Sequence, residues 1–282
     1  MEEIDTSYLH ARKLLVPMFE SVKIVMVGCG GTGSWLAPAI VRIGKLLVEQ
    51  GKQVWIAFCD HDQVEEKNIY RQNFCAAEIG RNKAETLAFR YGGAWGMSVN
   101  AVSTRFEADS NLMDGWARDC LRLFIGCVDN AGGRLAIHQY LENLNNGNLF
   151  WWLDCGNERS NGQVLLGNPE DEPEDLYNLP EYVNWFPSPA VQHPELVATD
   201  NVPQAPLDPS TRLGEPNNRE NLSCAEMALQ DAQGLVINQV IASHAADYIL
   251  RLLVTKDLRK YATYIDMESG SVRSRYMVKD GE

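Results

Sequence analysis

A glycine-rich turn near the start of the chain is the first feature that could do chemistry. The largely apolar segment 21–27 ends in Gly28-x-Gly30-Gly31-x-Gly33. In this spacing after a buried strand, the first glycine permits a tight turn, the second lets the backbone approach phosphate, and the third allows a helix to pack closely on the strand. Free N–H groups at the start of that helix favour an anion. The segment predicts a nucleotide site but does not distinguish NAD, FAD and ATP.

An acidic residue stands at the end of the next apolar run. A carboxylate at this place, Asp60, can accept hydrogen bonds from both hydroxyls of a ribose. The gap from Gly33 to Asp60 is 27 residues, somewhat longer than the usual ~20. The alternative is that Asp60 only caps a turn in the sequence Asp60-His61-Asp62.

A polar segment with two cations follows. Asn68, Arg71 and Gln72 come in quick succession, and Lys83 follows eleven residues after Gln72. Arginine presents a planar fork that suits phosphate, and lysine supplies a compact charge. Two cations and two amides match a triphosphate and a pyrophosphate leaving group, whereas a nicotinamide site needs an open face for hydride transfer. The alternative is a solvated polar loop.

A second acidic residue follows the buried run 124–128. This residue, Asp129, is placed where ligands bind in open α/β sheets, at the carboxyl end of a strand. A carboxylate there can hold Mg²⁺ against phosphates. Asp129 can also cap the helix that follows, and the two roles are compatible.

The elements that must position these residues alternate between strand and helix. This pattern predicts an α/β fold, a Rossmann-like, doubly wound and mostly parallel sheet with antiparallel C-terminal strands. Strands are expected over 21–27, 54–59, 98–106, 121–128, 149–153 and 163–166, with a hairpin over 261–267 and 272–277. Helices are expected over 34–50, 78–91, 112–118, 134–144, 223–232 and 235–253.

The chain is predicted to divide into four parts. These are an N-terminal arm with one short helix (1–21), a nucleotide-binding domain (22–167), a Pro-rich acidic crossover loop (168–222), and C-terminal helices and a hairpin that complete the same domain (223–282). The crossover loop reads as an extended surface segment, since most of the prolines and a dense acidic run fall there.

Bulk composition excludes several classes. The chain has 282 residues and a net charge of −13, and such a field opposes nucleic acid. No apolar stretch approaches the ~20 residues of a membrane span, and because the N-terminus is acidic we do not expect it to be a signal peptide. The seven cysteines contain no Cys-x-x-Cys pair, so we expect no disulfide framework, no zinc site and a cytoplasmic location.

The ordered series of motifs resembles the ThiF/MoeB/ubiquitin-activating enzyme family. It consists of the glycine turn, Asp60-x-Asp62-x-Val64-Glu65-x-x-Asn68-x-x-Arg71-Gln72, then Lys83, then Cys127-Val128-Asp129-Asn130. The resemblance spans residues 22 to about 167 and resumes at Ser223-Cys224-Ala225-Glu226. It looks closest to bacterial ThiF-like proteins encoded beside small ubiquitin-like partners, including the PRTRC group.

The resemblance implies a function. Members of the family adenylate the C-terminal glycine carboxylate of a ubiquitin-like protein with MgATP, and many pass the acyl group on to a cysteine or to sulfur. By motif position, Gly30 and Gly31 would approach the phosphates, Asp60 would bind ribose, and Asp129 would position Mg²⁺ and the attacking carboxylate. The resemblance also places Asp62, Asn68, Arg71, Gln72, Lys83 and Asn130 in the nucleotide site, most of them around the triphosphate.

The resemblance also implies partners. It suggests a homodimer, a ubiquitin-like partner and a possible conjugating enzyme. Family homodimers often lend an arginine across the interface, but the spacing from Arg12 to Gly28 is short for that role. The paired Cys-x-x-Cys zinc ligands of many sulfur-carrier activators are missing, which again predicts no zinc.

Cys224 is the candidate acyl acceptor. It opens a predicted helix after the crossover loop, and a helix N-terminus lowers the pKa of a thiol. Its position resembles that of the family cysteine, so we expect it to form a thioester. Cys155, at the end of a strand, is a competitor, and Cys29 reads as a small side chain within the glycine turn. The alternative is an unreactive cysteine at a helix start.

Three other functions remain open at this point. An NAD- or FAD-dependent oxidoreductase explains Gly28 to Asp60 but leaves Arg71, Lys83 and Asp129 without a role. A non-catalytic scaffold that binds a partner through residues 168–221 is a second possibility. A third possibility is adenylation of a different acceptor, either a peptide or a tRNA base. The negative net charge of the chain is weak evidence against tRNA.

Overall fold

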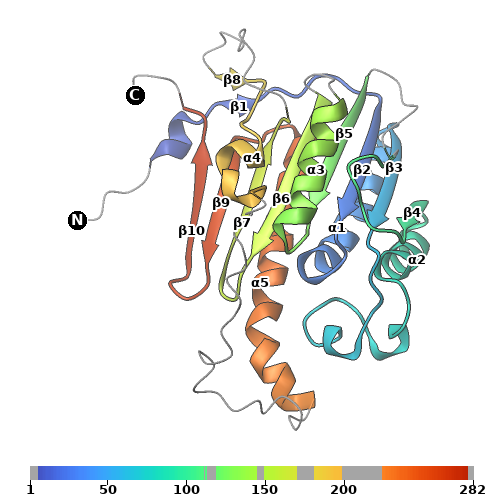
Figure 1. Ribbon diagram of the computed structural model, residues 1–282. Helices are drawn as coiled ribbons and strands as arrows, with labels where there is room; N and C mark the ends of the chain where they lie inside the picture. Colours follow the sequence, from blue (N-terminus) through green and yellow to red (C-terminus); the bar gives the residue numbers. More distant parts are fainter. Residues whose placement is uncertain are drawn as a thin grey trace.

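A single eight-stranded sheet organises the chain. The computed structural model describes residues 6–110, 112, 119–144, 149–169, 181–198 and 224–278, and over 224–235 it describes the backbone alone. The strand order is β10-β9-β7-β6-β5-β2-β3-β4 (Figure 1). The strands are β2 (Ser21–Val27), β3 (Gln53–Cys59), β4 (Val99–Val102), β5 (Cys120–Gly126), β6 (Phe150–Asn157), β7 (Asn161–Gly167), β9 (Lys260–Asp266) and β10 (Ser271–Tyr276).

The sheet has a parallel half and an antiparallel half. Strands β4, β3, β2, β5 and β6 pair in parallel, as βαβ crossovers require. Strands β7, β9 and β10 each pair antiparallel with their neighbour. The predicted fold class is confirmed, and the C-terminal strands share one sheet with the glycine-turn strand.

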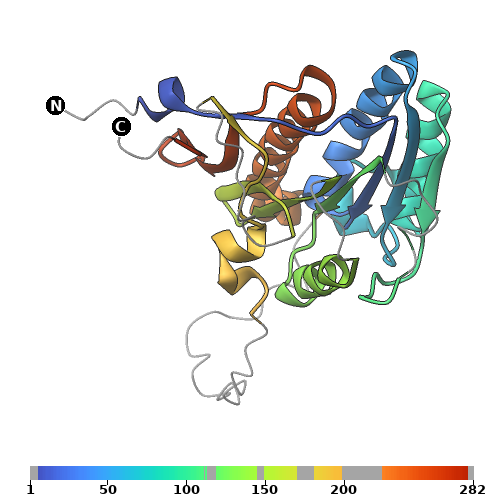
Figure 2. The ribbon, with the colours of Figure 1, turned by 90° about the horizontal axis from the view of Figure 1, so that it is seen from above.

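Helices cover both faces of the sheet. In Figure 1, α3 (Ala131–Leu144) and α4 (Pro189–Gln192) lie in front, while α1 (Gly31–Glu49), α2 (Lys83–Trp95) and α5 (Cys224–Leu250) lie behind; the view from above in Figure 2 shows the same layers. Alternate residues of β2 serve the two faces. Ile24 and Met26 join the core under α1 and α5, and Val25 and Val27 join the core under α3.

The two helices predicted at 223–232 and 235–253 are one helix, α5, so the predicted break was wrong. A glycine stands between the two predicted ranges, at position 234, but glycine inside a helix costs only about 1 kcal/mol. The packing of α5 against α1, β6 and β7 outweighs that cost, since Ile237, Ile241, Ala245 and Tyr248 are all buried. The helix continues as a π-helical turn, Arg251–Thr255.

Several other boundaries differ from the predictions. The helix expected from residue 78 begins at Lys83, because the Asn82 side chain caps it by accepting a hydrogen bond from the Glu85 N–H at 3.0 Å. The strand expected over 98–106 is only the four residues of β4. Most of the helix predicted at 112–118, and most of the crossover loop, lie outside the described residues.

The N-terminal arm contains the expected short helix, η1 (Ser7–His10). It also contains an unpredicted two-residue strand, β1 (Lys13–Leu14), which pairs in parallel with β8 (Tyr182–Val183). In the part of the chain that is described, no helix is both long enough and apolar enough to cross a bilayer.

Candidate functional site

A cavity of about 1570 Å³ lies at the carboxyl ends of β2, β3 and β5. It continues past the β6–β7 turn to the antiparallel strands. The cavity brings together the residues that were predicted to form a site, from four separate stretches of sequence. Those that line it are Gly28, Gly30, Gly31, Asp60, Asp62, Asn68, Arg71, Gln72, Lys83, Asp129 and Asn130.

The glycine turn depends on missing side chains. Gly28 has φ +93°, and a Cβ there would lie 2.5 Å from the Cys127 carbonyl oxygen. A Cβ on Gly33 would lie 2.0 Å from the carbonyl oxygen of Gly28. Gly33 therefore lets α1 pack against the turn, and it does not line the cavity.

The middle of the turn faces open space. A Cβ on Gly30 would meet nothing closer than Gln72 Nε2, at 3.7 Å. A Cβ on Gly31 would instead lie 2.5 Å from Asn238 Oδ1. Backbone at Gly30 is thus accessible from the cavity, next to the N-terminus of α1, where N–H groups attract an anion.

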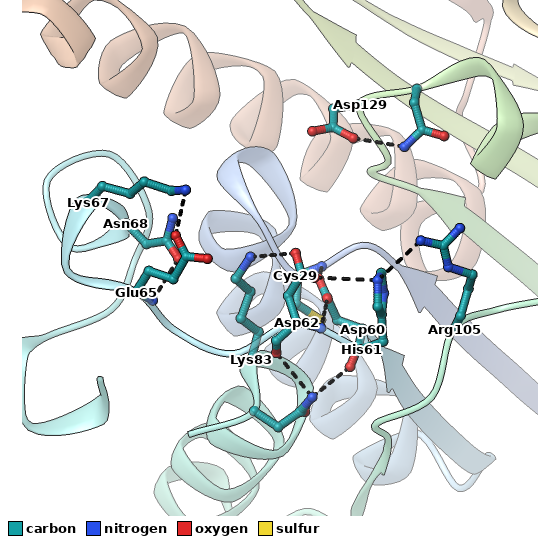
Figure 3. A network of polar contacts seen from close by, with 12 residues as sticks. Cys29, Asp60, His61, Asp62, Glu65, Lys67, Asn68, Lys83, Arg105 and Asp129 are labelled. Carbon is teal, nitrogen blue, oxygen red and sulfur yellow. Dashed lines mark hydrogen bonds and ion pairs between the residues drawn. The ribbon is translucent and has the colours of Figure 1, made fainter. Parts of the chain in front are cut away.

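Asp60 holds the turn as well as lining the cavity. Its Oδ2 accepts a hydrogen bond from the Cys29 N–H at 2.6 Å, and its Oδ1 accepts one from the Asp62 N–H at 2.9 Å. These bonds connect the end of β3 to the glycine turn of β2 (Figure 3). The turn-capping reading of Asp60 is therefore correct, and it leaves the carboxylate beside the cavity.

Lys83 is buried at the first turn of α2. Its Nζ donates to Asp62 Oδ2 at 3.0 Å (Figure 3). Burial alone would raise the pKa of Asp62, but the hydrogen bond and charge of Lys83 lower it overall. Among the described residues, there is one cluster of at least three His, Cys, Asp or Glu side chains close enough to share a metal ion, and it consists of Asp60, His61 and Asp62. Lys83 already neutralises the charge of Asp62 in this cluster.

Two buried polar atoms near the turn have no hydrogen-bond partner. They are Arg71 Nε and Gln72 Oε1, and both residues line the cavity. The neighbouring Asn68 is buried and accepts a hydrogen bond from the Glu65 N–H at 2.9 Å. Because buried polar groups are nearly always paired, the orphaned atoms indicate a site that a polar ligand completes.

Asp129 reaches the cavity from a separate segment, between β5 and α3 (Figure 3). It is exposed, and its Oδ1 accepts a hydrogen bond from Asn130 Nδ2 at 3.0 Å. Asn130 Oδ1 accepts the Gly133 N–H at 2.8 Å. The helix cap is thus supplied by Asn130 rather than by Asp129, which leaves Asp129 available to a ligand.

A polar cluster beside the turn was not predicted. Thr32 Oγ1 lies 3.0 Å from Asn157 Oδ1 and 3.3 Å from Asn238 Oδ1, and all three residues line the cavity. Asn238 comes from α5 and is 206 residues away from Thr32 in sequence. Asn238 is one of several polar residues of α5 and belongs to no motif, so the sequence alone could not identify it.

A buried ion pair at the cavity wall was also missed. Arg134 Nε in α3 lies 3.1 Å from both carboxylate oxygens of Asp154, which ends the parallel part of β6. Burial raises the pKa of Asp154 to about 6, although the charge of Arg134 opposes this shift. The pair fixes the first turn of α3, which follows Asp129, against the sheet.

This pKa predicts a pH dependence of stability. The raised value means that folding disfavours the ionised carboxylate, so the wild type should lose stability relative to the Asp154→Asn variant as pH rises from about 4 to above 6. At about 1.36 kcal/mol per unit, the shift from 3.8 to about 6 corresponds to about 3 kcal/mol. Urea unfolding of the two proteins across this range measures the difference.

A control of opposite sign is available. Burial would raise the pKa of Asp247, but Lys260 and Arg251 lower it. The advantage of Asp over Asn at position 247 should therefore fall as pH falls. An advantage at position 154 that grows with pH would contradict the assignment.

The thiols near the turn are poor nucleophiles. Burial raises the pKa of Cys29 well above its ordinary value and that of Cys59 to about 12. The pKa of Cys155 is also raised well above its ordinary value. The main cause is a hydrogen bond with Cys127, and burial is the second cause. Since the thiolate is the reactive form, Cys155 is a weak competitor for an acyl group. Cys224 begins α5, but its side chain lies outside what is described.

The chain is similar to known proteins over most of its length. The ThiF family model matches residues 16–279. No curated protein sequence matches the chain. Among solved structures, E. coli MccB with ATP aligns to 92% of this chain with 16% identity and a TM-score of 0.53, and E. coli MccB with AMPCPP and MccA aligns to 92% with 15% identity and a TM-score of 0.54.

A third similar structure is that of PaaA, which aligns to 92% of this chain with 14% identity and a TM-score of 0.51. The chain spans 64% of the length of PaaA, and 64% and 65% of the two MccB chains. At these identities the likeness shows a shared fold.

Proposed function

The chain belongs to the ThiF family, and on this basis we propose that it uses ATP to adenylate the C-terminal carboxylate of a peptide or protein. One observation carries the proposal. The cations Arg71 and Lys83, the open turn at Gly30 and the exposed carboxylate of Asp129 all line one cavity although they come from separate elements. The complexes of the fold relative MccB with ATP, and with AMPCPP and MccA, support the same reading.

The residues present fit a nucleoside triphosphate. Backbone N–H groups at Gly30 and the start of α1 suit phosphate, and the Asp60 carboxylate suits the ribose hydroxyls. The unpartnered Arg71 Nε and Gln72 Oε1 are a buried donor and a buried acceptor. A dinucleotide would use the turn and Asp60 but would leave these groups unexplained.

The reaction is a displacement at the α-phosphorus of ATP. An oxygen of the acceptor carboxylate forms a bond to that phosphorus, and the bond to the oxygen bridging the α- and β-phosphates breaks. The products are an acyl adenylate and pyrophosphate. Arg71 and Lys83 would neutralise the charge that develops on the pyrophosphate, and the turn would hold the α-phosphate in line.

Mg²⁺ fits the same site. When bound, it would neutralise phosphate charge, and the exposed carboxylate of Asp129 is an oxygen ligand of the kind it prefers. Asp129 would also orient the attacking carboxylate. The neighbouring Asn130 holds Asp129 Oδ1, which limits the rotation of that side chain.

The proposed acceptor, oligomeric state and partner follow from the resemblance of the sequence motifs to the ThiF/MoeB/ubiquitin-activating enzyme family. The acceptor would be the terminal glycine of a small ubiquitin-like protein, the chain would act as a homodimer, and a conjugating enzyme would be a possible partner. Arg12 lines a separate, smaller cavity with Lys13 and Arg259, away from the nucleotide cavity of its own chain. Arg12 could therefore contribute to a nucleotide site only if that site belonged to a second subunit.

Cys224 would then accept the acyl group as a thioester, with AMP as the leaving group. Its place at the start of α5 supports this role. A thiol-sensitive adduct between the enzyme and a ubiquitin-like partner should disappear in Cys224→Ala. An adduct that persists in that variant would assign the reaction to another residue.

Pyrophosphate exchange tests the proposed function. Labelled pyrophosphate should enter ATP only when an acceptor with a free C-terminal carboxylate and Mg²⁺ are present. Lys83→Met should reduce the exchange by about a hundredfold, since it keeps the side-chain length and removes the charge. Lys52→Met is the control, because Lys52 pairs with Glu20 and does not line the cavity. Exchange that needs no acceptor carboxylate would refute the proposal.

A further inference from the structure

The groups that would contact the β- and γ-phosphates must keep a fixed distance from the glycine turn. Arg71 and Gln72 lie on the loop between β3 and α2, and Lys83 is the first residue of α2. The anion-binding end of α1 begins at Gly31. The loop contains only two single turns of 3₁₀-helix, so side-chain contacts must hold it in place.

One asparagine, Asn73, connects the loop to α1. Its backbone N–H donates to Ser34 Oγ at 2.9 Å, and its Nδ2 donates to the Ser34 carbonyl oxygen at 3.3 Å. Ser34 is fully buried, and its Oγ donates to the Gly31 carbonyl oxygen at 3.0 Å. Asn73 is therefore linked to the glycine turn through two successive hydrogen bonds.

The same asparagine connects the loop to α2. Asn73 Nδ2 donates a second hydrogen bond, to the Tyr91 hydroxyl at 2.8 Å, and Arg90 Nη1 donates to the Asn73 carbonyl oxygen at 2.7 Å. Arg90 Nη1 also donates to the Tyr91 hydroxyl at 3.2 Å, and Arg90 forms an ion pair with Glu78 of the loop. Both amide hydrogens of Asn73 are thus used, one on each helix.

A second contact holds the loop on the other side of Gln72. The ring N–H of Trp35, in α1, donates to the Arg71 carbonyl oxygen at 3.3 Å. Gln72 is therefore held between two attached residues, and a Cβ on Gly30 would lie 3.7 Å from its Nε2. The contacts of Asn73 reach both helices, whereas the Trp35 contact reaches α1 alone. A change at Asn73 should therefore displace this part of the loop more.

We propose that Asn73 is a positioning residue for the reaction. It fixes Arg71 and Gln72 against the first turn of α1, so that both side chains meet the β- and γ-phosphates of ATP. Asn73 does not line the cavity, so it acts through these two neighbours. This inference rests on the proposed adenylation function and adds a residue that lies outside the motif series.

A comparison of two nucleotides tests this role. AMP lacks the phosphates that Arg71 would contact, whereas AMPCPP carries them. Asn73→Asp keeps the size of the side chain but replaces its N–H donors by an acceptor that faces the Ser34 carbonyl oxygen. Calorimetry should show that AMPCPP affinity falls about tenfold, as for the loss of one hydrogen bond to a charged group, while AMP affinity changes less than about twofold. A general disturbance of the fold would lower both affinities alike.

Asn100→Asp is the matched control. Asn100 Nδ2 also donates to a backbone carbonyl oxygen, that of Ile56 at 3.0 Å, but Asn100 lies on β4 and does not line the cavity. Both affinities should stay at their wild-type values in this control. Tyr91→Phe is a milder second variant, because it removes only the hydroxyl that accepts from Asn73 and Arg90. It should lower AMPCPP affinity by about threefold and leave AMP affinity unchanged.

A further measurement shows whether Asn73 acts through its neighbours. In a protein that already carries Arg71→Met and Gln72→Met, adding Asn73→Asp should lower AMPCPP affinity by less than about twofold. An additional loss as large as in wild type would overturn the positioning role. So would equal losses of AMP and AMPCPP affinity, or unchanged AMPCPP affinity, in Asn73→Asp and Tyr91→Phe; if Asn73→Asp does not fold, Tyr91→Phe alone decides. A wild type that does not bind AMPCPP would instead overturn the proposed function.

Discussion

Asp129→Asn is expected to lower acceptor-dependent pyrophosphate exchange by about a hundredfold to a thousandfold. The change keeps the size of the side chain and removes the negative charge that would hold Mg²⁺ and orient the acceptor carboxylate. Losing one electrostatic contact in a preorganised site usually costs that much in rate. The measurement is the exchange rate at saturating ATP, with ATP affinity determined by calorimetry.

The control for this substitution is Glu49→Gln. Glu49 is an exposed acid at the far end of α1 from the glycine turn, so neutralising it should leave both quantities unchanged. An Asp129→Asn variant with wild-type exchange would remove Asp129 from the mechanism.

Gly33→Ala is expected to destabilise the protein and to eliminate ATP binding. The new Cβ would lie 2.0 Å from the Gly28 carbonyl oxygen, and this atom belongs to backbone that is fixed by a hydrogen bond from the Gly28 N–H to the Cys59 carbonyl oxygen at 2.9 Å. The turn or α1 must therefore move. We expect a loss of at least about 3 kcal/mol in the free energy of unfolding, measured by urea unfolding.

Gly30→Ala is the matched control within the same turn. A Cβ at Gly30 meets no atom closer than 3.7 Å, so the free energy of unfolding should stay near the wild-type value. ATP affinity should nevertheless fall, because the methyl group enters the space where a phosphate would approach the backbone. Equal losses of stability in the two variants would contradict the distinction drawn between packing and binding glycines.

The parallel half of the fold was predictable because its signals are local. Buried strands such as β2 and β5 are short apolar runs that end in glycine or a polar residue, and the predicted strand at 21–27 has the same bounds as β2. Where the predicted element bounds were wrong, tertiary contacts determined the actual bounds. The glycine at 234 does not interrupt α5, since the helix is stabilised by packing against α1 and the sheet.

Only those residues of the candidate site that belong to a motif with a regular spacing could be predicted from the sequence. The segment from Asp60 to Lys83 and the position of Asp129 carry their own signal, and the structure brings them to one cavity. The sequence carries no such signal for pairs such as Arg134–Asp154 and Tyr264–His193, because their contacts depend on helix placement and strand register. A charged residue that interrupts a buried strand, as Asp154 does, was the one available hint.

A crystal structure with AMPCPP and Mg²⁺ is the most direct test of the central claim. It should show the α-phosphate between the Gly30 backbone and Asp129, with the β- and γ-phosphates toward Arg71 and Lys83. A nucleotide whose phosphates lie away from these cations, or that leaves Asp129 without contact to the nucleotide or its metal, would contradict the account.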